Sequence, residues 1–251
     1  GTETINLSPG ASVSSRAIVG QPLGVLFGTG SKTNPDGSLD LDENGFPQIT
    51  SSEIILGDPN PDWRAGIAFN LNYKKFRLNA LVEHSQGGVF SPRTLHVLNR
   101  LGTTEMTANR ETLTQDLVNY AGDVISAGSV VRGNIEDFGA GAVLLDETWY
   151  RTGIGGGFGD NQAYNFSTYD ASFTKLREVT LSYVFDSPNL RSTTGLDNII
   201  VSVSGRNLLN FNNIPGIDPE TNQTGVGQAQ GLDYFTNPQT KSTFFSVTLN
   251  Y

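Results

Sequence analysis

An acidic segment of this 251-residue chain has the residue spacing of a calcium-binding loop. Asp40, Asp42 and Asn44 stand at the first, third and fifth positions of such a loop, where oxygen ligands are needed. The twelfth position is Ser51 instead of the glutamate that would bind the ion through both carboxylate oxygens. Asx and glycine turns are the alternative for the segment 36–45, and the missing glutamate favours them. Whether this segment binds calcium stays open at this point.

Two glycine-rich segments and two histidines complete the candidates for catalysis or cofactor binding. The segment 28–33, GTGSKT, has a serine where a phosphate loop has a glycine before Lys32, and turn residues follow it instead of a helix. The segment 153–159, GIGGGFG, lacks the spacing of a dinucleotide-binding loop, so we expect a surface loop. His84 and His96 each lack a second histidine four residues away, which excludes the HExxH type of zinc site.

The composition argues against the common enzyme classes. Cysteine is absent, so no thiol nucleophile and no thiolate metal site can form. Folding could bring two of the 25 acidic residues together for glycoside hydrolysis, but nothing in the sequence singles out a pair. We therefore expect no catalytic residue, no cofactor and no metal site. The net charge of −9 also argues against nucleic acid as a partner, because phosphates require a basic surface.

The elements that position these residues are expected to be strands. The 29 glycines, together with many Asn, Ser and Thr residues, predict an all-β chain with many turns. No run of eighteen apolar residues is present, which excludes a transmembrane helix, whereas a strand of a membrane barrel needs only about ten alternating residues. The first ten residues lack the cationic and apolar segments of a signal peptide. The protein is therefore either cytosolic, or these residues are not its true beginning.

Six segments alternate between apolar and polar residues, as strands do when one face is apolar. Their ranges are 22–29, 65–73, 76–84, 173–185, 198–208 and 243–251. Only Lys74 and Lys75 separate the second segment from the third, which predicts a tight hairpin. The alternation places one set of charged residues together on the polar face of these strands. This set comprises Arg77, Glu83, Glu178 and Arg206.

The connections between these strands alternate in length. They contain about 35, 2, 88, 12 and 33 residues in chain order. Short turns that alternate with long loops are typical of an outer-membrane barrel, with the short turns in the periplasm and the long loops outside. A soluble sandwich has no reason to sort its loops in this way. The sequence thus predicts a transmembrane antiparallel β-barrel segment of about six strands with long extracellular loops. Because bacterial barrels have at least eight strands, further strands are expected before Gly1.

This topology assigns a membrane level to several residues. Tyr251 is expected at the periplasmic rim, which makes the C-terminus periplasmic. Four more aromatic residues flank the short turns and are expected at the same level, where amphipathic rings settle. They are Tyr73, Phe76, Tyr183 and Phe185. Lys175 and Arg177 share the parity of the lipid face near the external rim, where cations could meet lipopolysaccharide phosphates. The alternative is an ordinary solvated strand end.

The long connection, about 85–172, is the expected place for recognition. The spacing of Leu95, Leu98 and Leu101 predicts a short amphipathic helix over 92–102. Aromatic residues gather in the second half of the connection, where they could stack on sugar faces or contact a lid protein. Those singled out for such contacts are Trp149, Tyr150, Tyr164 and Phe166, and Phe158 and Tyr169 lie near them. The alternative is that these rings pack the loop on itself.

Five motifs occur in one order that resembles a known family. They are LGDPNPDW (56–63), KLREVTLSY (175–183), SGRNLL (204–209), GIDPE (216–220) and the terminal aromatic strand. Together they resemble the C-terminal part of the SusC/RagA-type TonB-dependent transporters of Bacteroidota. The resemblance covers about 18–251, nearly the whole chain.

The resemblance implies a 22-stranded outer-membrane barrel around an N-terminal plug, of which residues 1–251 would be the last part. It implies TonB-dependent uptake of oligosaccharides or peptides with a SusD-like surface lipoprotein. The plug, the TonB-contacting segment and the signal peptide are absent from this chain, and TonB would act through that missing part. In such proteins the barrel-assembly machinery is expected to recognise the terminal strand. The residues of this assembly signal would be Phe245, Val247, Leu249 and Tyr251.

Two alternatives to an importer in the outer membrane of a Gram-negative bacterium are kept. A passive or structural barrel would lack both plug and TonB segment. A soluble carbohydrate-binding β domain would need neither detergent nor further strands. The polar-face residues could bind cargo, anchor the plug or pair across strands.

Overall fold

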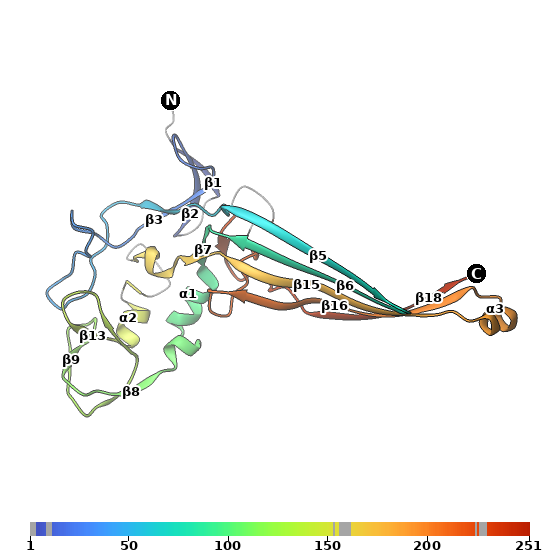
Figure 1. The fold of residues 1–251 in the computed structure, drawn as a ribbon. Coiled ribbons are helices and arrows are strands. Elements are labelled where there is room, and N and C mark those ends of the chain that lie inside the picture. Colours follow the sequence, from blue (N-terminus) through green and yellow to red (C-terminus); the bar gives the residue numbers. More distant parts are fainter. Residues whose placement is uncertain (1–3, 9–11, 153, 156–161, 224, 226–229) are drawn as a thin grey trace. The chain divides into compact units, whose positions relative to one another are not determined.

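The computed structural model describes residues 4–8, 12–152, 154–155, 162–223, 225 and 230–251 (Figure 1). The chain divides into two compact units. The loop unit comprises Gly1–Asn60, Gly88–Asp170 and Ile214–Asn237, and the sheet unit comprises Pro61–Gly87, Ala171–Asn213 and Pro238–Tyr251.

The sheet unit is built on one antiparallel sheet in which strands adjacent in this unit pair with each other, in the order β18-β16-β15-β6-β5 (Figure 1). The strands are β5 (Trp63–Tyr73), β6 (Phe76–Gln86), β15 (Phe173–Phe185), β16 (Asn198–Asn212) and β18 (Ser242–Asn250). Five of the six predicted strands are thus confirmed, with ends shifted by a few residues. The predicted hairpin is confirmed too, because Tyr73 pairs with Phe76 and Lys74 adopts a φ of 54° in the two-residue turn.

The connection between β15 and β16 contains a short helix, α3 (Pro188–Thr194), that the sequence analysis missed. The Ser187 hydroxyl caps its first turn by accepting a hydrogen bond from the Leu190 amide. Gly195, with a φ of 75°, ends it in the left-handed region that glycine adopts without strain.

The predicted strand 22–29 does not belong to this sheet. Its central residues form β3 (Val25–Gly28) in a separate four-stranded sheet of the loop unit, in the order β1-β2-β3-β4. The neighbours are β1 (Thr4–Ser8), β2 (Ser14–Ile18) and β4 (Ile54–Gly57). A strand of four residues is too short to cross a bilayer, and Leu26 is buried in a core cluster with Val13 and Tyr164. The prediction of six membrane strands was therefore wrong for this segment, and the sheet has five strands.

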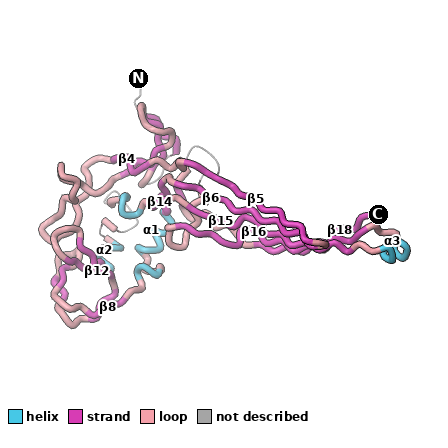
Figure 2. Tube along the Cα trace, viewed as in Figure 1, coloured by secondary structure: helices cyan, strands magenta, loops and turns pink. Residues whose placement is uncertain are grey.

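The rest of the loop unit consists of short elements joined by turns (Figure 2). Its strands are β7 (Val89–Pro92), β8 (Arg110–Thr112), β9 (Leu117–Val118), β10 (Val124–Ile125), β11 (Val130–Arg132), β12 (Asn134–Asp137), β13 (Ala142–Leu145), β14 (Tyr169–Asp170) and β17 (Leu232–Asp233). Its helices are α1 (Arg93–Arg100), α2 (Glu147–Arg151), η1 (Glu105–Thr107) and η2 (Tyr164–Ser167). Among the described residues, no helix is long and apolar enough to cross a membrane.

Helix α1 confirms the helix predicted in the long connection, but its buried face differs from the predicted one. The residues buried on α1 are Leu95, His96 and Asn99. Leu101 follows the helix and is 67% exposed. The three-residue spacing of the leucines therefore predicted the helix correctly. It predicted the buried face only in part, because Leu95 is buried and Leu101 is exposed.

Candidate functional site

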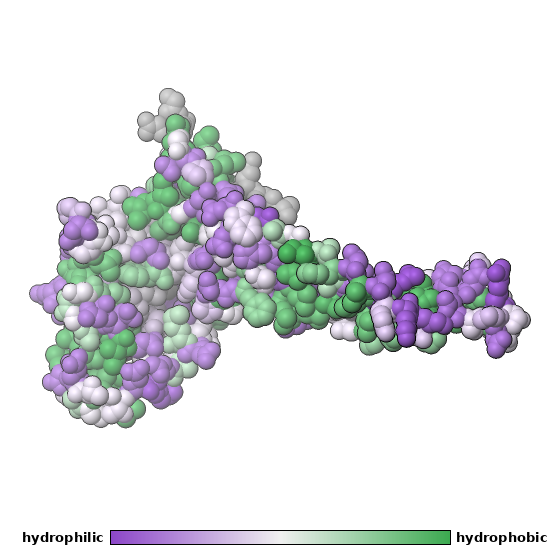
Figure 3. Space-filling model, in the orientation of Figure 1, coloured by the Kyte–Doolittle hydropathy of each residue, from purple (hydrophilic) through white to green (hydrophobic). Residues whose placement is uncertain are grey.

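One face of the five-stranded sheet is apolar, and the register explains why. Phe69 pairs with Ala80, and Ala80 with Val179, so their side chains share one face. Phe69 is 56% exposed and Phe245 is 83% exposed. Hydrophobic residues accordingly gather on the surface over these strands (Figure 3). Contiguous exposed apolar surface on this scale marks an interaction with a membrane or another protein.

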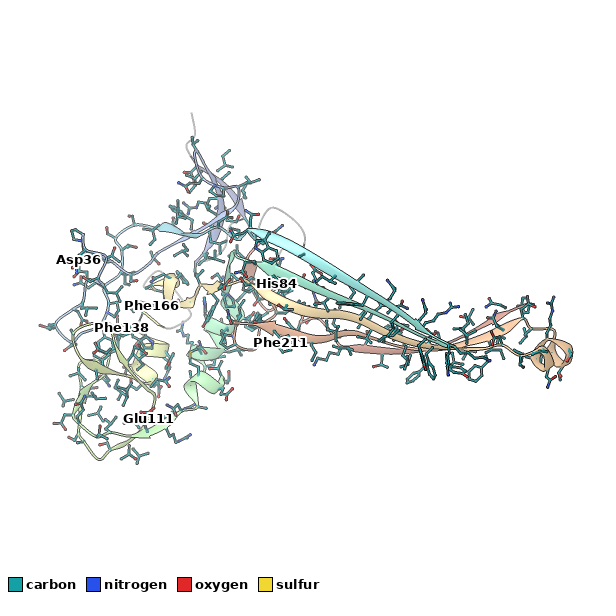
Figure 4. The ribbon with its side chains drawn as sticks, viewed as in Figure 1. Asp36, His84, Glu111, Phe138, Phe166 and Phe211 are labelled. Carbon is teal, nitrogen blue, oxygen red and sulfur yellow. The ribbon has the colours of Figure 1, made fainter. Side chains whose placement is uncertain are left out.

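Aromatic residues bound this apolar face at both ends. Tyr73, Phe76 and Tyr183 form one row, with the rings of Phe76 and Tyr183 centred 4.7 Å apart. Trp63 lies at the other end of β5, with its ring centred 4.9 Å from that of His84. His84 and Phe211 lie at that same end of the sheet (Figure 4).

The distance between these aromatic ends matches a bilayer. Ten residues separate Trp63 from Tyr73 along β5, which is about 33 Å at the rise of a β-strand. A strand tilted by about 40° would span roughly 25 Å along the membrane normal, the height of the apolar band of outer-membrane barrels. The pairing places Tyr73, Phe76 and Tyr183 in one row of the sheet, whereas Phe185 and Tyr251 lie beyond that row. The membrane level predicted for these five residues stays a prediction.

The opposite face is polar and carries all four charged residues that alternation assigned to it. Arg206 Nε donates to Glu178 Oε2 over 3.0 Å between neighbouring strands. Ser202 pairs with Ser182, and their hydroxyls are 2.9 Å apart. These contacts favour pairing across strands as the role of Glu178 and Arg206. Arg77 lies on this face opposite Ser182, and no ion pair in the described part of the chain includes it.

The prediction for Lys175 and Arg177 was wrong, because a β-bulge changes the parity of β15. Leu176 pairs with Val82 and Glu178 with Leu81, so Arg177 is the extra residue. Lys175 therefore pairs with Glu83 on the polar face, and it is only 2% exposed. Arg177 Nε donates to Glu83 Oε2 over 2.7 Å. Neither cation faces the apolar side, where lipopolysaccharide would be met.

Most of the aromatic residues singled out in the long connection lie in cores of the loop unit. Trp149 is 4% exposed and packs in one cluster with Tyr150 and Phe46. Tyr164 is buried in a second cluster. Phe166 is 37% exposed, and its ring is centred 5.7 Å from that of Phe138 (Figure 4). These positions favour packing of the loop on itself, and Phe158 lies outside the described residues.

The partners of this aromatic cluster were not anticipated. Phe46, Tyr120 and Phe138 surround Trp149 at ring distances of 5.5 to 5.7 Å. Phe46 lies more than 100 positions before Trp149, directly after the acidic segment, and no local sequence pattern connects the two.

The acidic segment forms turns. Asp42 Oδ1 accepts hydrogen bonds from the Asn44 and Phe46 amides, both over 2.9 Å, and Asp40 forms an ion pair with Lys32. Asp36 Oδ1 accepts from the amide and hydroxyl of Ser38, which lowers the pKa of Asp36. The Asx-turn alternative is thus confirmed. In the described ranges, no group of three His, Cys, Asp or Glu residues is placed to hold a metal ion.

Neither glycine-rich segment provides a described phosphate-binding or dinucleotide-binding loop. Gly28, the first residue of the glycine-rich segment 28–33, is the last residue of β3, and Ser31 forms an isolated bridge with Ile49, so the strand does not lead into a helix. Most of the segment 153–159 lies outside the described residues.

His96 occupies a buried polar position that the sequence did not reveal. Its Nε2 donates to the Ser167 carbonyl oxygen over 2.8 Å, which makes Nδ1 the unprotonated nitrogen. Burial lowers the pKa of His96 to about 4, so the imidazole is neutral at pH 7. His96 Nδ1 and Asp233 Oδ2 are both buried without a hydrogen-bond partner and line one small cavity.

No family model matches this chain, but comparisons with curated proteins and with solved structures find similar proteins. The chain is 28% identical over 224 residues to TonB-dependent receptor P3 of Formosa agariphila, which covers 87% of this chain and 19% of the receptor. A chain of the RagAB peptide importer in its closed-closed state matches with a TM-score of 0.58 and 15% identity over 99% of this chain and 25% of that chain. The open-open state matches with a TM-score of 0.58 and 14% identity, over 100% and 24%.

These matches concern a part of each relative. The chain spans about a fifth of the length of the curated relative and about a quarter of the RagAB chain. The curated match is named a receptor and the structural match an importer, and neither name is that of an enzyme. In sequence this chain is similar to part of a TonB-dependent receptor, and its fold is that of part of a RagAB importer chain.

Proposed function

We propose that this chain is the C-terminal part of an outer-membrane transporter that imports oligosaccharides or peptides by TonB-dependent active uptake. The observation that carries the proposal is the exposed apolar face of the five-stranded sheet, bounded by aromatic residues at the spacing of a bilayer. The similarity to a TonB-dependent receptor and to the RagAB importer supports it.

In this proposal the five strands are a segment of a 22-stranded barrel. Backbone groups on the outer edges of β5 and β18 would pair with strands outside this chain, since unpaired groups are not tolerated in lipid. The turn at Lys74 and Lys75 and the C-terminus would face the periplasm, and the long connection between β6 and β15 would face the outside. Arg77, Glu83, Glu178 and Arg206 would then point into the lumen.

The partners follow from the same proposal. A SusD-like surface lipoprotein would close over the barrel, and TonB would act through the N-terminal part of the transporter. The barrel-assembly machinery would recognise the terminal strand, whose outward side chains Phe245, Val247 and Leu249 are exposed, as is Tyr251 after it. Lipid would cover the apolar face. Of the four loop aromatics, the exposed Phe166 is the best placed to contact cargo or lipoprotein.

The soluble carbohydrate-binding alternative would have to explain the large exposed apolar face. The passive-barrel alternative shares that face, but it would lack the plug and the TonB segment and would need no energy from TonB. In cells, uptake that persists without TonB would favour the passive barrel over the importer.

Adjacent cysteine variants test the membrane assignment, because residues 1–251 contain no cysteine and any cysteine elsewhere in the full-length protein is replaced by serine first. Phe69→Cys and Asn70→Cys alter neighbouring residues on opposite faces of β5. Each variant of the full-length protein is labelled with a fluorophore and reconstituted into vesicles that contain a lipid-borne quencher. We expect strong quenching for the label at residue 69 and little for the label at residue 70. Equal quenching at the two positions would refute the lipid-facing assignment.

A further inference from the structure

The loop unit contains a cavity of about 580 Å³ that no part of the proposed function has used. This volume is within the range of sites that hold small molecules. Part of its wall is apolar and comes from Ile125, Val131 and Leu144. Tyr150 also lines the cavity, and its hydroxyl accepts a hydrogen bond from Asn134 Nδ2 over 2.8 Å.

The acidic residues that line this cavity are committed to other groups. Asp146 Oδ1 accepts from the Thr148 amide over 2.8 Å, and its Oδ2 accepts from Asn119 Nδ2 over 3.0 Å. Glu147 forms an ion pair with Arg151 one helical turn later. Neither carboxylate is therefore available to neutralise a further cation in the wall.

Arg132 is such a cation, and its guanidinium is held in place by backbone oxygens. Its Nε donates to the Thr107 carbonyl oxygen over 2.7 Å, and its Nη2 donates to the Gly102 carbonyl oxygen over 2.6 Å. Thr107 and Gly102 also line the cavity. None of the ion pairs in the described part of the chain includes Arg132.

The strand pairing adds a second uncompensated arginine beside the first. Arg132 pairs directly with Arg110 in the two-stranded ribbon of β8 and β11. Like charges directly opposite each other destabilise a ribbon, and Arg110 also lacks an ion pair among the described residues. The net charge of the chain is −9, so this pair concentrates positive charge beside the cavity of an otherwise acidic chain.

We propose that this cavity binds a carboxylate that stands next to an apolar group, with Arg132 as its charged partner. An arginine fork that is already oriented loses little entropy when it binds a carboxylate. The aliphatic wall favours a carboxylate attached to an apolar side chain, as at the C-terminus of a short peptide. An acidic sugar has a carboxylate but no apolar side chain to contact the aliphatic wall. The inference rests on the proposed function only in treating this ligand as cargo.

The experiment is calorimetric titration of the full-length protein in detergent with a tripeptide that ends in leucine, as the free acid and as the C-terminal amide. Since a charge-assisted hydrogen bond is worth more than a neutral one, we expect the amide to bind about ten- to hundredfold more weakly. A disaccharide that ends in a uronic acid is the third ligand, and we expect it to bind more weakly than the free-acid peptide. Equal affinity for the acid and the amide, or no binding of the acid, would overturn the proposal. Tighter binding of the uronate disaccharide than of the free-acid peptide would overturn the claim that the wall selects an apolar side chain.

Variants assign the effect to the cavity. Arg132→Met is expected to bind acid and amide equally, whereas Arg110→Met, the matched control outside the cavity wall, should keep the discrimination. Arg132→Lys retains the charge without the fork and keeps the proposal testable if the methionine variant does not fold. Discrimination that survives in Arg132→Met would refute the assignment. Acid binding without any TonB-dependent uptake would contradict the importer and leave the cavity assignment standing.

Discussion

The depth dependence of an arginine placed on the apolar face is the sharpest prediction for the membrane assignment. Phe69 lies near the middle of β5, in the row that continues through Ala80 and Val179. In a bilayer, arginine at the midplane costs about 2–4 kcal/mol, and about 0–1 kcal/mol near the interface. We therefore expect Phe69→Arg to be about 2–4 kcal/mol less stable than Phe69→Ala. For Tyr73→Arg against Tyr73→Ala, in the aromatic row, the difference should be only about 0–1 kcal/mol.

The assay is the denaturant dependence of unfolding of the full-length protein in lipid vesicles. Both the arginine and the alanine variant lose the aromatic ring. The difference between their free energies of unfolding therefore reports the effect of the arginine side chain. Asn70→Arg, on the polar face beside Phe69, is the control and should change the free energy of unfolding by less than about 1 kcal/mol. A penalty that is the same at residues 69 and 73, or as large at residue 70, would refute a lipid-facing sheet.

Three further predictions concern the loop unit. His96 has a pKa of about 4 in the folded protein and of 6.5 in the unfolded chain. Because the unfolded chain takes up the proton first, the free energy of unfolding is highest above about pH 6.5 and falls by roughly 3 kcal/mol as the pH drops towards 4. The difference in unfolding free energy between pH 7.5 and pH 4.5 should shrink in His96→Gln, and an unchanged difference would count against the buried neutral imidazole. Trp149→Ala should cost about 3–5 kcal/mol in thermal or denaturant unfolding, because the ring is buried among other aromatic residues, and a loss below about 1 kcal/mol would contradict that packing. Asp42→Ala should cost about 1–2 kcal/mol by leaving two amides without their acceptor, and a calcium-dependent shift in the melting temperature of the unmodified protein would contradict the turn assignment.

The sequence predicted most of the sheet because local pattern and tertiary structure agree there. In β5 and β6 every residue alternates without interruption from Trp63 to Gln86, apart from the two-residue turn. The alternation alone therefore placed Arg77 and Glu83 on the polar face correctly. It also placed the aromatic residues at the turn in one row, since the pairing of Tyr73 with Phe76 follows from the length of the turn.

Helix α3 shows a pattern that was readable and was not used. Serine, proline and glycine stand at residues 187, 188 and 195, where they act as N-cap, first helical residue and left-handed C-terminal stop. The strand 22–29 shows the opposite case. Its alternation is weak, and its partners β2 and β4 are strands of five and four residues that the sequence did not predict, so only the folded structure reveals its separate sheet.

The core of the loop unit could not be derived from local sequence for a physical reason. The rings that surround Trp149 come from residues 46, 120, 138 and 166. Irregular turns connect these segments, and a periodic sequence pattern cannot predict where such turns bring the segments together. An aromatic-rich loop has the same composition whether its rings face a ligand or one another. Burial decides between these, and burial depends on contacts between distant segments.

The bulge at Arg177 limits what alternation can say about any charged residue near the end of a long strand. One extra residue moves Lys175 from the apolar to the polar face, opposite Glu83, and leaves Leu176 beside Val82 on the apolar face. Without the bulge, Lys175 and Arg177 would both face the apolar side, where a charge costs from about 0–1 kcal/mol near the interface to about 2–4 kcal/mol at the midplane of a bilayer. With it, both cations lie on the side of Glu83, and the apolar face carries leucine and valine instead. The bulge therefore keeps this face of β15 apolar from Leu176 to Tyr183, as the proposed contact with lipid requires.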